Sequence, residues 1–214
     1  MEVRAVVFDV GGVVTGSPLD AIRTYERDLG LSRNAINHAI VAVGESGAWS
    51  RLERGELQLE EFFTPFESDM RSQGLPVDGR RMFEYIAEAS LVRPSMVSAI
   101  SKLRAAGLQV AALTNNWRSE GDREPRPFEG LFDVVVESSV VGLRKPDPRI
   151  YRLVCRELGV ELSESVFLDD IGRNLKAARA LGMATIKVEE PLEALRELEA
   201  LVGFALLDSG ADAE

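Results

Sequence analysis

Hydrophobic and polar positions follow different patterns in two parts of the chain. Residues 3–13 form a continuous, valine-rich apolar run, which is typical of a strand buried on both faces. After residue 90, shorter apolar runs alternate with helical patterns. We expect strands at 108–113, 134–136, 166–168 and 184–188, and helices at 94–106, 148–158, 173–181 and from 191 onward. This alternation predicts an α/β fold, a parallel sheet with helices on both faces.

The stretch between residues 15 and 90 shows no convincing strand pattern. Helical patterns lie at 18–30, 32–44, 59–73 and 79–89, and a charged stretch separates the second from the third. An all-helical block directly after the first strand predicts an inserted cap of roughly four helices. We therefore expect a Rossmann-like core made of residues 1–15 and 91–214, and a helical cap made of residues 16–90.

Composition narrows the class of protein and of ligand. The chain has 214 residues, a net charge of −10 and a single cysteine, so no disulfide can form within it. A uniformly acidic protein lacks the basic surface of a nucleic-acid binder and is repelled by anionic membranes, so we expect neither as a partner. No apolar run is long enough to span a bilayer, and the first strand begins close to Met1. We expect no signal peptide and a cytoplasmic location.

Reactive side chains follow the predicted strands, where the carboxyl ends of a parallel sheet meet at one edge. These side chains are Asp9, Thr114 and Asn115, Lys145, and Asp169 with Asp170. Each has a plain structural reading when it is taken alone, as a turn, a helix cap or a surface lysine. Together, two acidic strand ends suit Mg²⁺, which takes oxygen ligands, and a lysine adds a compact positive charge. A carboxylate nucleophile, a metal ion and a cation are what phosphoryl transfer needs.

Four motifs, in the order in which they occur along the chain, resemble those of the haloacid dehalogenase-like hydrolase superfamily. They are FDVGGV at 8–13, LTN at 113–115, RKPD at 144–147 and FLDD at 167–170. Residues 168–175 and the glycine turn are similar to the branch that contains the phosphatase domain of soluble epoxide hydrolases. The resemblance spans essentially the whole chain. It implies a capped Rossmann-like core, Mg²⁺ as cofactor, and an aspartate nucleophile that forms an aspartyl-phosphate. We therefore expect hydrolysis of a small phosphate monoester.

The resemblance also implies catalytic and metal-binding roles. Asp9 would be the nucleophile and a metal ligand, and Lys145 would neutralise the nucleophile and the phosphate. Gly11 would bind the metal ion through its backbone carbonyl. Asp170 would bind the ion directly, and Asp169 would contact it through a water molecule.

The remaining implied roles concern the phosphate and the support of the site. Thr114 and Asn115 would bind the substrate phosphate, and Asn174 would brace the loop that carries the paired aspartates. Position 11 departs from the family pattern, because phosphatases of this superfamily usually carry a second aspartate there as general acid and base. Such a group contributes about 10²–10⁴-fold in rate, so with Gly11 we expect slow turnover or a substitute group.

Two alternative functions remain open. Haloacid dehalogenase-type hydrolases also lack the second aspartate but work without a metal ion, and the Asp169 and Asp170 pair argues against them. A non-catalytic phospho-ligand binding protein would keep the pocket and lose turnover. The substrate and the oligomeric state are not determined by the sequence. We interpret Phe62, Phe63 and Phe66 as cap core.

Overall fold

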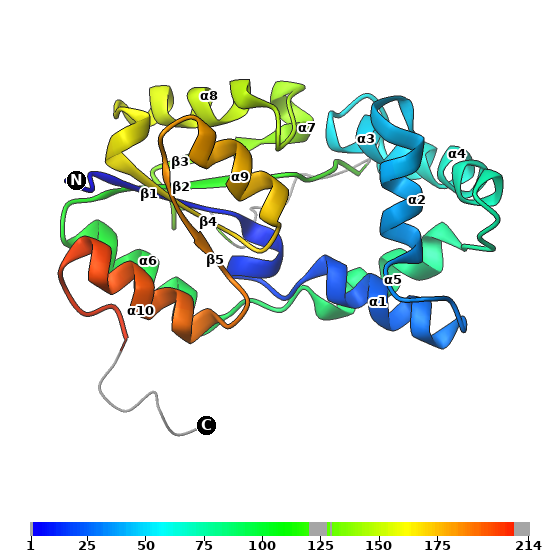
Figure 1. Ribbon diagram of the computed structural model, residues 1–214, viewed down its shortest axis with the longest axis horizontal. Coiled ribbons are helices and arrows are strands. Elements are labelled where there is room, and N and C mark those ends of the chain that lie inside the picture. The colour runs from blue at the N-terminus through cyan, green and yellow to red at the C-terminus, as the bar shows by residue number, and fades with distance from the viewer. Residues whose placement is uncertain (1, 120–127, 129, 208–214) are drawn as a thin grey trace.

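The computed structural model describes residues 2–119, 128 and 130–207. A five-stranded parallel sheet forms its centre, in the order β3-β2-β1-β4-β5 (Figure 1). This confirms the predicted α/β class. The order reverses beside β1, the position at which such sheets bind ligands outside their carboxyl ends. The strands are β1 (Ala5–Phe8), β2 (Gln109–Thr114), β3 (Val134–Glu137), β4 (Ser165–Asp169) and β5 (Ala184–Lys187).

The register of the two central strands places two aspartates next to each other. β1 pairs with β4 in parallel, and Phe8 lies opposite Leu168. The residues that follow this pair are Asp9 and Asp169, so both carboxylates emerge at the same edge of the sheet. All four residues of β1 are fully buried, which explains the uninterrupted apolar run in the sequence.

Helices cover both faces of the sheet, because successive side chains of each strand point to opposite sides. On one face, Val6 and Phe8 pack against α6 (Pro94–Ala105) and α10 (Pro191–Val202). On the other face, Ala5 and Val7 pack against α8 (Pro148–Leu158) and α9 (Gly172–Ala180). A short helix, α7 (Ser138–Val141), follows β3 and was not expected from the pattern. None of the described helices is both long and apolar enough to cross a membrane.

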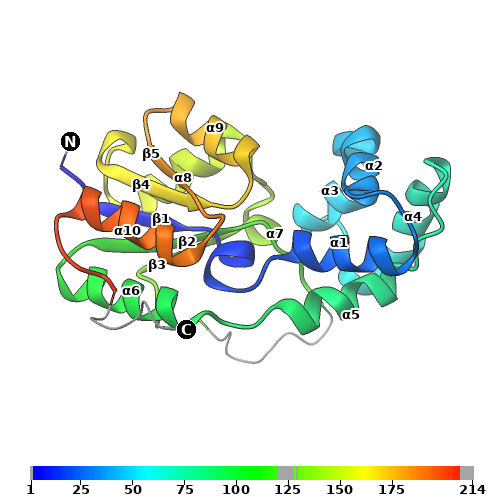
Figure 2. The ribbon, with the colours of Figure 1, turned by 60° about the horizontal axis from the view of Figure 1, so that its bottom comes forward.

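Five helices follow β1 and lie beyond the carboxyl edge of the sheet (Figures 1 and 2). They pack around their own apolar core, in which the three expected phenylalanines are buried. The pattern predicted roughly four helices, because α3 occupies the charged stretch and is too short to show a helical period. The helices are α1 (Pro18–Asp28), α2 (Ala35–Val43), α3 (Ala48–Glu53), α4 (Leu59–Ser72) and α5 (Gly79–Ala89).

The two connections between these helices and the sheet lie side by side. Thr15 and Val92 form an antiparallel bridge, and the Gly16 amide donates to the Leu91 carbonyl at 3.0 Å. A Cβ atom at Gly16 would lie 1.9 Å from the last carbonyl oxygen of α5, so the close crossing requires glycine. We propose that residues 16–90 form the cap and that this pair of connections is its hinge.

Candidate active site

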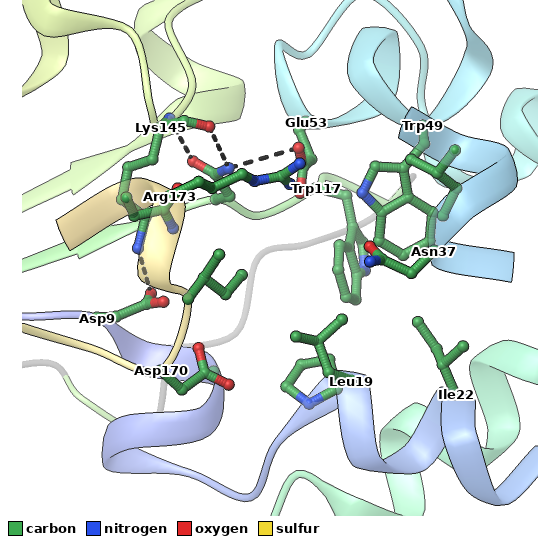
Figure 3. A pocket seen from close by; sticks show the side chains of 16 residues that line it. Asp9, Leu19, Ile22, Asn37, Trp49, Glu53, Trp117, Lys145, Asp170 and Arg173 are labelled. Atoms are coloured by element: carbon green, nitrogen blue, oxygen red, sulfur yellow. Dashed lines mark hydrogen bonds and ion pairs between the residues drawn. The ribbon is translucent and has the colours of Figure 1, made fainter. Parts of the chain in front are cut away.

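The carboxylate of Asp9, directly after β1, is paired with a buried lysine (Figure 3). Asp9 Oδ1 accepts a 2.7 Å hydrogen bond from the Val10 amide and lies 2.8 Å from Lys145 Nζ. Lys145 is 1% exposed. Burial raises the pKa of the Asp9 carboxyl well above its ordinary range, against the opposing effect of the Lys145 ammonium. The carboxylate is therefore poorly hydrated, which favours contact with a cation or a bound ligand.

Lys145 is shared between Asp9 and a second carboxylate. Its Nζ atom also donates to Asp169 Oδ2 at 2.8 Å. Burial alone would lower the pKa of Lys145, but the carboxylates of Asp169 and Asp9 raise it above its ordinary value, so the lysine stays charged. Asp169 also accepts from the Ile171 amide at 2.7 Å and from Asn174 Nδ2 at 3.1 and 3.2 Å. The Asn174 amide therefore lies against the Asp169 carboxylate, on the loop that carries the paired aspartates.

Asp170 differs from Asp169 because one of its buried oxygens has no partner. Ser17 Oγ donates to Asp170 Oδ2 at 3.1 Å, whereas Oδ1 is buried and accepts no hydrogen bond within the described part of the chain. Burial raises the pKa of Asp170 to about 6, and the nearby Asp169 carboxylate adds to this. Oxygens of Asp9, Asp169 and Asp170 lie within 4.8 Å of one another. An unpartnered buried carboxylate oxygen in a cluster of three carboxylates fits a hard divalent cation.

Thr114 and Asn115, at the end of β2, lie at the same edge of the sheet as Asp9. Thr114 is buried, and its hydroxyl donates to the Asn115 carbonyl at 3.4 Å. The Asn115 side chain braces the backbone of Lys145, since its Oδ1 accepts from the Lys145 amide at 2.8 Å and its Nδ2 donates to the Lys145 carbonyl at 3.2 Å. Asn115 lines the cavity described below, whereas Thr114 is not among its lining residues.

A cavity of about 310 Å³ opens above Asp9, between the sheet edge and the helices that follow β1 (Figure 3). Its floor includes Gly11, Lys145 and Asp170. Its polar wall includes Asn37, Glu53 and Arg173. Its apolar lining consists of Pro18, Leu19, Ile22, Ile40, Trp49, Trp117 and Ile171. The cavity therefore has a charged floor and a largely apolar upper wall.

Position 11 carries a normal backbone conformation, with φ of −69° and ψ of 123°. A Cβ atom at this position would lie 3.0 Å from Pro18 Cγ of α1, a tight contact that a small shift of the Pro18 ring would relieve. Because residue 11 is glycine, no carboxyl group is present at the position that resembles the family's acid and base.

A model of the family described as haloacid dehalogenase-like hydrolases matches residues 3–182. The chain belongs to this family. It is 41% identical over 209 residues to acyl-CoA dehydrogenase family member 10 of Mus musculus, an alignment that covers 95% of this chain and 19% of that protein. It is 36% identical to bifunctional epoxide hydrolase 2 of Sus scrofa, and the alignment covers 99% of this chain and 41% of that protein. The chain thus spans less than half the length of these relatives.

A third relative of this haloacid dehalogenase-like hydrolase has a similar length. It is the sesquiterpene phosphatase astK of Aspergillus oryzae, 29% identical, with 94% of this chain and 97% of that protein covered. Among solved structures, a haloacid dehalogenase family enzyme of Bacteroides thetaiotaomicron in complex with magnesium and inorganic phosphate has a TM-score of 0.58 at 19% identity, with 86% and 93% covered. A dehalogenase with an intermediate complex has a TM-score of 0.62 at 21% identity, with 95% and 99% covered. These two structures show the shared fold.

The family membership and the enzyme class predicted from the four motifs are confirmed: the chain is a haloacid dehalogenase-like hydrolase with phosphatase relatives. Several cavity residues were missed by sequence reasoning, among them Glu53, Trp117 and Arg173. Trp117 lies two residues after the LTN motif and Arg173 lies three residues after Asp170, so their closeness to these motifs was a usable signal for both. Glu53 carries no local signal, because only the tertiary fold brings α3 to the sheet edge.

Proposed function

We propose that this hydrolase is a Mg²⁺-dependent phosphatase that cleaves a small phosphate monoester through an aspartyl-phosphate at Asp9. One observation carries the proposal: the Asp9 carboxylate is held on one oxygen by Lys145, beside the Asp170 oxygen that has no partner. Mg²⁺ would be held by Asp9, Asp170 and the Gly11 carbonyl, and it would neutralise phosphate oxygens. The relatives that are named phosphatases support the same reaction class.

The proposed reaction has two successive displacement steps at phosphorus. A carboxylate oxygen of Asp9 attacks phosphorus, and the bond from phosphorus to the ester oxygen breaks. Lys145 balances the charge of Asp9 and of the phosphate, while Asp169 and Asn174 hold its ammonium in place. Water then attacks the phosphorus of the aspartyl-phosphate, which releases phosphate and restores Asp9. Since position 11 has no carboxyl group, the leaving oxygen takes its proton from water.

The cavity supports a preference in the organic part of the ester. Its upper wall is formed mainly by aliphatic side chains of α1 and α2 and by the rings of Trp49 and Trp117. A volume of about 310 Å³ suits a small organic group, and burial of an apolar group there would contribute about 25 cal/mol for each Å² removed from water. We therefore propose monoesters whose organic group is mainly apolar.

The test measures phosphate release from a panel of monoesters with Mg²⁺ and with a chelator. Release should require Mg²⁺ and should disappear in Asp9→Asn. The matched control is Glu157→Gln, a carboxylate-to-amide change at an exposed ion pair on α8, which should behave like the parent. Release that persists in the chelator, or in Asp9→Asn, contradicts the proposal.

Dehalogenation is a second candidate, because Gly11 is compatible with a leaving group that needs no proton. The same preparation is therefore offered a 2-haloacid without metal, and halide is measured. Metal-independent halide release would identify a dehalogenase. Tight phosphate binding without turnover of any ester would identify a phospho-ligand binding protein.

A further inference from the structure

The loop that carries Lys145 also sends a buried arginine toward the cap helices. Arg144 is 7% exposed, and its Nε donates to Glu53 Oε2 at 2.6 Å. Its Nη1 donates to Glu45 Oε1 at 3.0 Å and to Ser50 Oγ at 3.1 Å. All three partners lie between α2 and the end of α3. One guanidinium therefore ties the lysine loop to the cap.

Glu53 is the partner that also touches the active site. Its Oε2 accepts from Asn115 Nδ2 at 3.4 Å, and Glu53 itself lines the cavity. The Asn115 amide in turn holds both the N–H and the C=O of Lys145. The contacts thus run without a break from Glu53 through Asn115 and Lys145 to Asp9, as the dashed lines of Figure 3 show in part.

The chemistry of Glu53 decides which way the Asn115 amide points. A carboxylate only accepts hydrogen bonds, so it draws the NH₂ end of the amide toward itself. The oxygen of Asn115 then faces the Lys145 N–H, which needs an acceptor. Glu53 is 7% exposed, and Arg144 supplies the positive charge that a buried carboxylate requires. The cap therefore presents an acceptor-only group that is held in place by its own ion pair.

We propose that Glu53 is a positioning residue: from the cap, it orients the Asn115 amide and so places Lys145 against Asp9. Docking of the cap and completion of the lysine site are then one event. This inference rests on the proposed phosphatase function, and it adds a cap residue that acts through another side chain on the reacting carboxylate.

Two features of the chain make the inference testable. Glu45 contacts the same arginine but has a side chain that is 74% exposed and no bond to Asn115, so Glu45→Gln is a matched control. Trp49 belongs to α3 and Trp117 to the sheet side, and their ring centroids lie 6.5 Å apart. They are the only tryptophans of the sequence, so coupling of their rings in circular dichroism reports cap docking independently of activity.

The experiment measures kcat and KM for p-nitrophenyl phosphate with Mg²⁺. Glu53→Gln should lower kcat on the order of tenfold to a hundredfold with a smaller change in KM, since a misplaced catalytic group costs about 10²-fold. Glu45→Gln should stay within about threefold of the parent, as exposed ion pairs contribute little. The tryptophan signal should be the same in all three proteins.

A double-mutant cycle separates positioning from simple structural support. In an Asn115→Ala background, Glu53→Gln should cause no further loss of kcat, because its route to Lys145 is already removed. Asn115→Ser serves if the alanine variant does not fold. Additive losses overturn the inference, and so does an equal loss in Glu45→Gln. Loss of the tryptophan signal in Glu53→Gln also overturns it, because an undocked cap would then explain the slower reaction.

Failure of the phosphatase function would be recognised separately. If the parent hydrolyses no ester, the same variants are titrated with inorganic phosphate in the presence of Mg²⁺. Glu53→Gln should then weaken phosphate binding by about tenfold, the effect of a lost hydrogen bond to a charged group, while Glu45→Gln should not. Equal phosphate affinity in the parent and in Glu53→Gln would overturn the positioning role.

Discussion

Gly12 is the position at which the turn after β1 can be tested most directly. Its φ of +86° lies in the region that residues with a Cβ atom avoid. A Cβ atom at this position would lie 2.2 Å from Asp170 Oδ2 and 2.5 Å from Asp170 Cγ. Gly12→Ala therefore changes the backbone energy and the position of a candidate metal ligand together.

The two effects have different sizes. A positive φ in a residue with a Cβ atom costs about 1–2 kcal/mol. To restore even the 3.0 Å separation that real Cβ atoms respect, the nearest Asp170 oxygen must move by about 0.8 Å. Such a shift disrupts the 3.1 Å hydrogen bond from Ser17, and a bond to a charged acceptor is worth about 1.5–3 kcal/mol. We expect Gly12→Ala to lower the free energy of unfolding by about 2.5–5 kcal/mol, the sum of the two effects.

Gly107 provides the matched control, because it has a φ of +88° and no heavy atom within 4 Å of the added Cβ. Gly107→Ala should lose only the backbone contribution and keep the Mg²⁺ affinity of the parent. Urea unfolding and calorimetric Mg²⁺ titration measure the two quantities. Gly12→Ala should be less stable than Gly107→Ala by more than about 1 kcal/mol and bind Mg²⁺ at least about tenfold more weakly. Equal stability and equal Mg²⁺ affinity in the two variants would refute the reasoning.

Three further predictions concern the same edge of the sheet. Asp170→Ala should abolish Mg²⁺ binding and leave the circular dichroism spectrum unchanged; an unaltered calorimetric affinity would remove Asp170 from the metal site. Gly11→Asp should hydrolyse alkyl phosphates faster than the parent, and its gain with aryl phosphates should be smaller because their leaving groups depend less on a proton donor. The normal φ at position 11 permits this substitution if the Pro18 ring shifts by a few tenths of an ångström. Without divalent metal, the raised pKa of Asp170 should make the folded state less stable as pH rises from about 4 through about 6, because the folded protein must then hold a buried charge. Asp170→Asn should remove this pH-dependent loss of stability from unfolding curves measured over the same range.

The residues of the sheet edge could be predicted because their signals are local. A buried strand leaves an unbroken apolar run, and a carboxylate at its carboxyl end marks the sheet edge, as for Asp9 after β1 and Asp169 at the end of β4. Parallel pairing then brings such residues together even when they are far apart in the sequence. The order of the four motifs along the chain indicated the family, whereas one motif alone would not have done so.

The parts that the sequence did not predict depend on contacts between distant segments. The sequence did not indicate that the Asn115 amide, which was expected to bind phosphate, also contacts Lys145 and Glu53, although Glu53 lies 62 positions away in the chain. Which neighbouring segment an asparagine after a strand contacts is decided by the tertiary packing around it. The helix α3 was missed for a related reason, since six residues are too few to show a helical period.

The bridge between Thr15 and Val92 has a consequence for how proteins of this architecture can diversify. Residues in an antiparallel bridge have Cα atoms about 5 Å apart, so the inserted helices leave and re-enter the sheet region at nearly one point. An insertion with adjacent ends can be exchanged, lengthened or replaced by a tight turn without moving any strand of the sheet. Under the proposed function, most of the cavity wall lies on the inserted side of this junction and the reactive carboxylates lie on the other, so exchange of the insertion would alter the wall and leave the sheet edge in place.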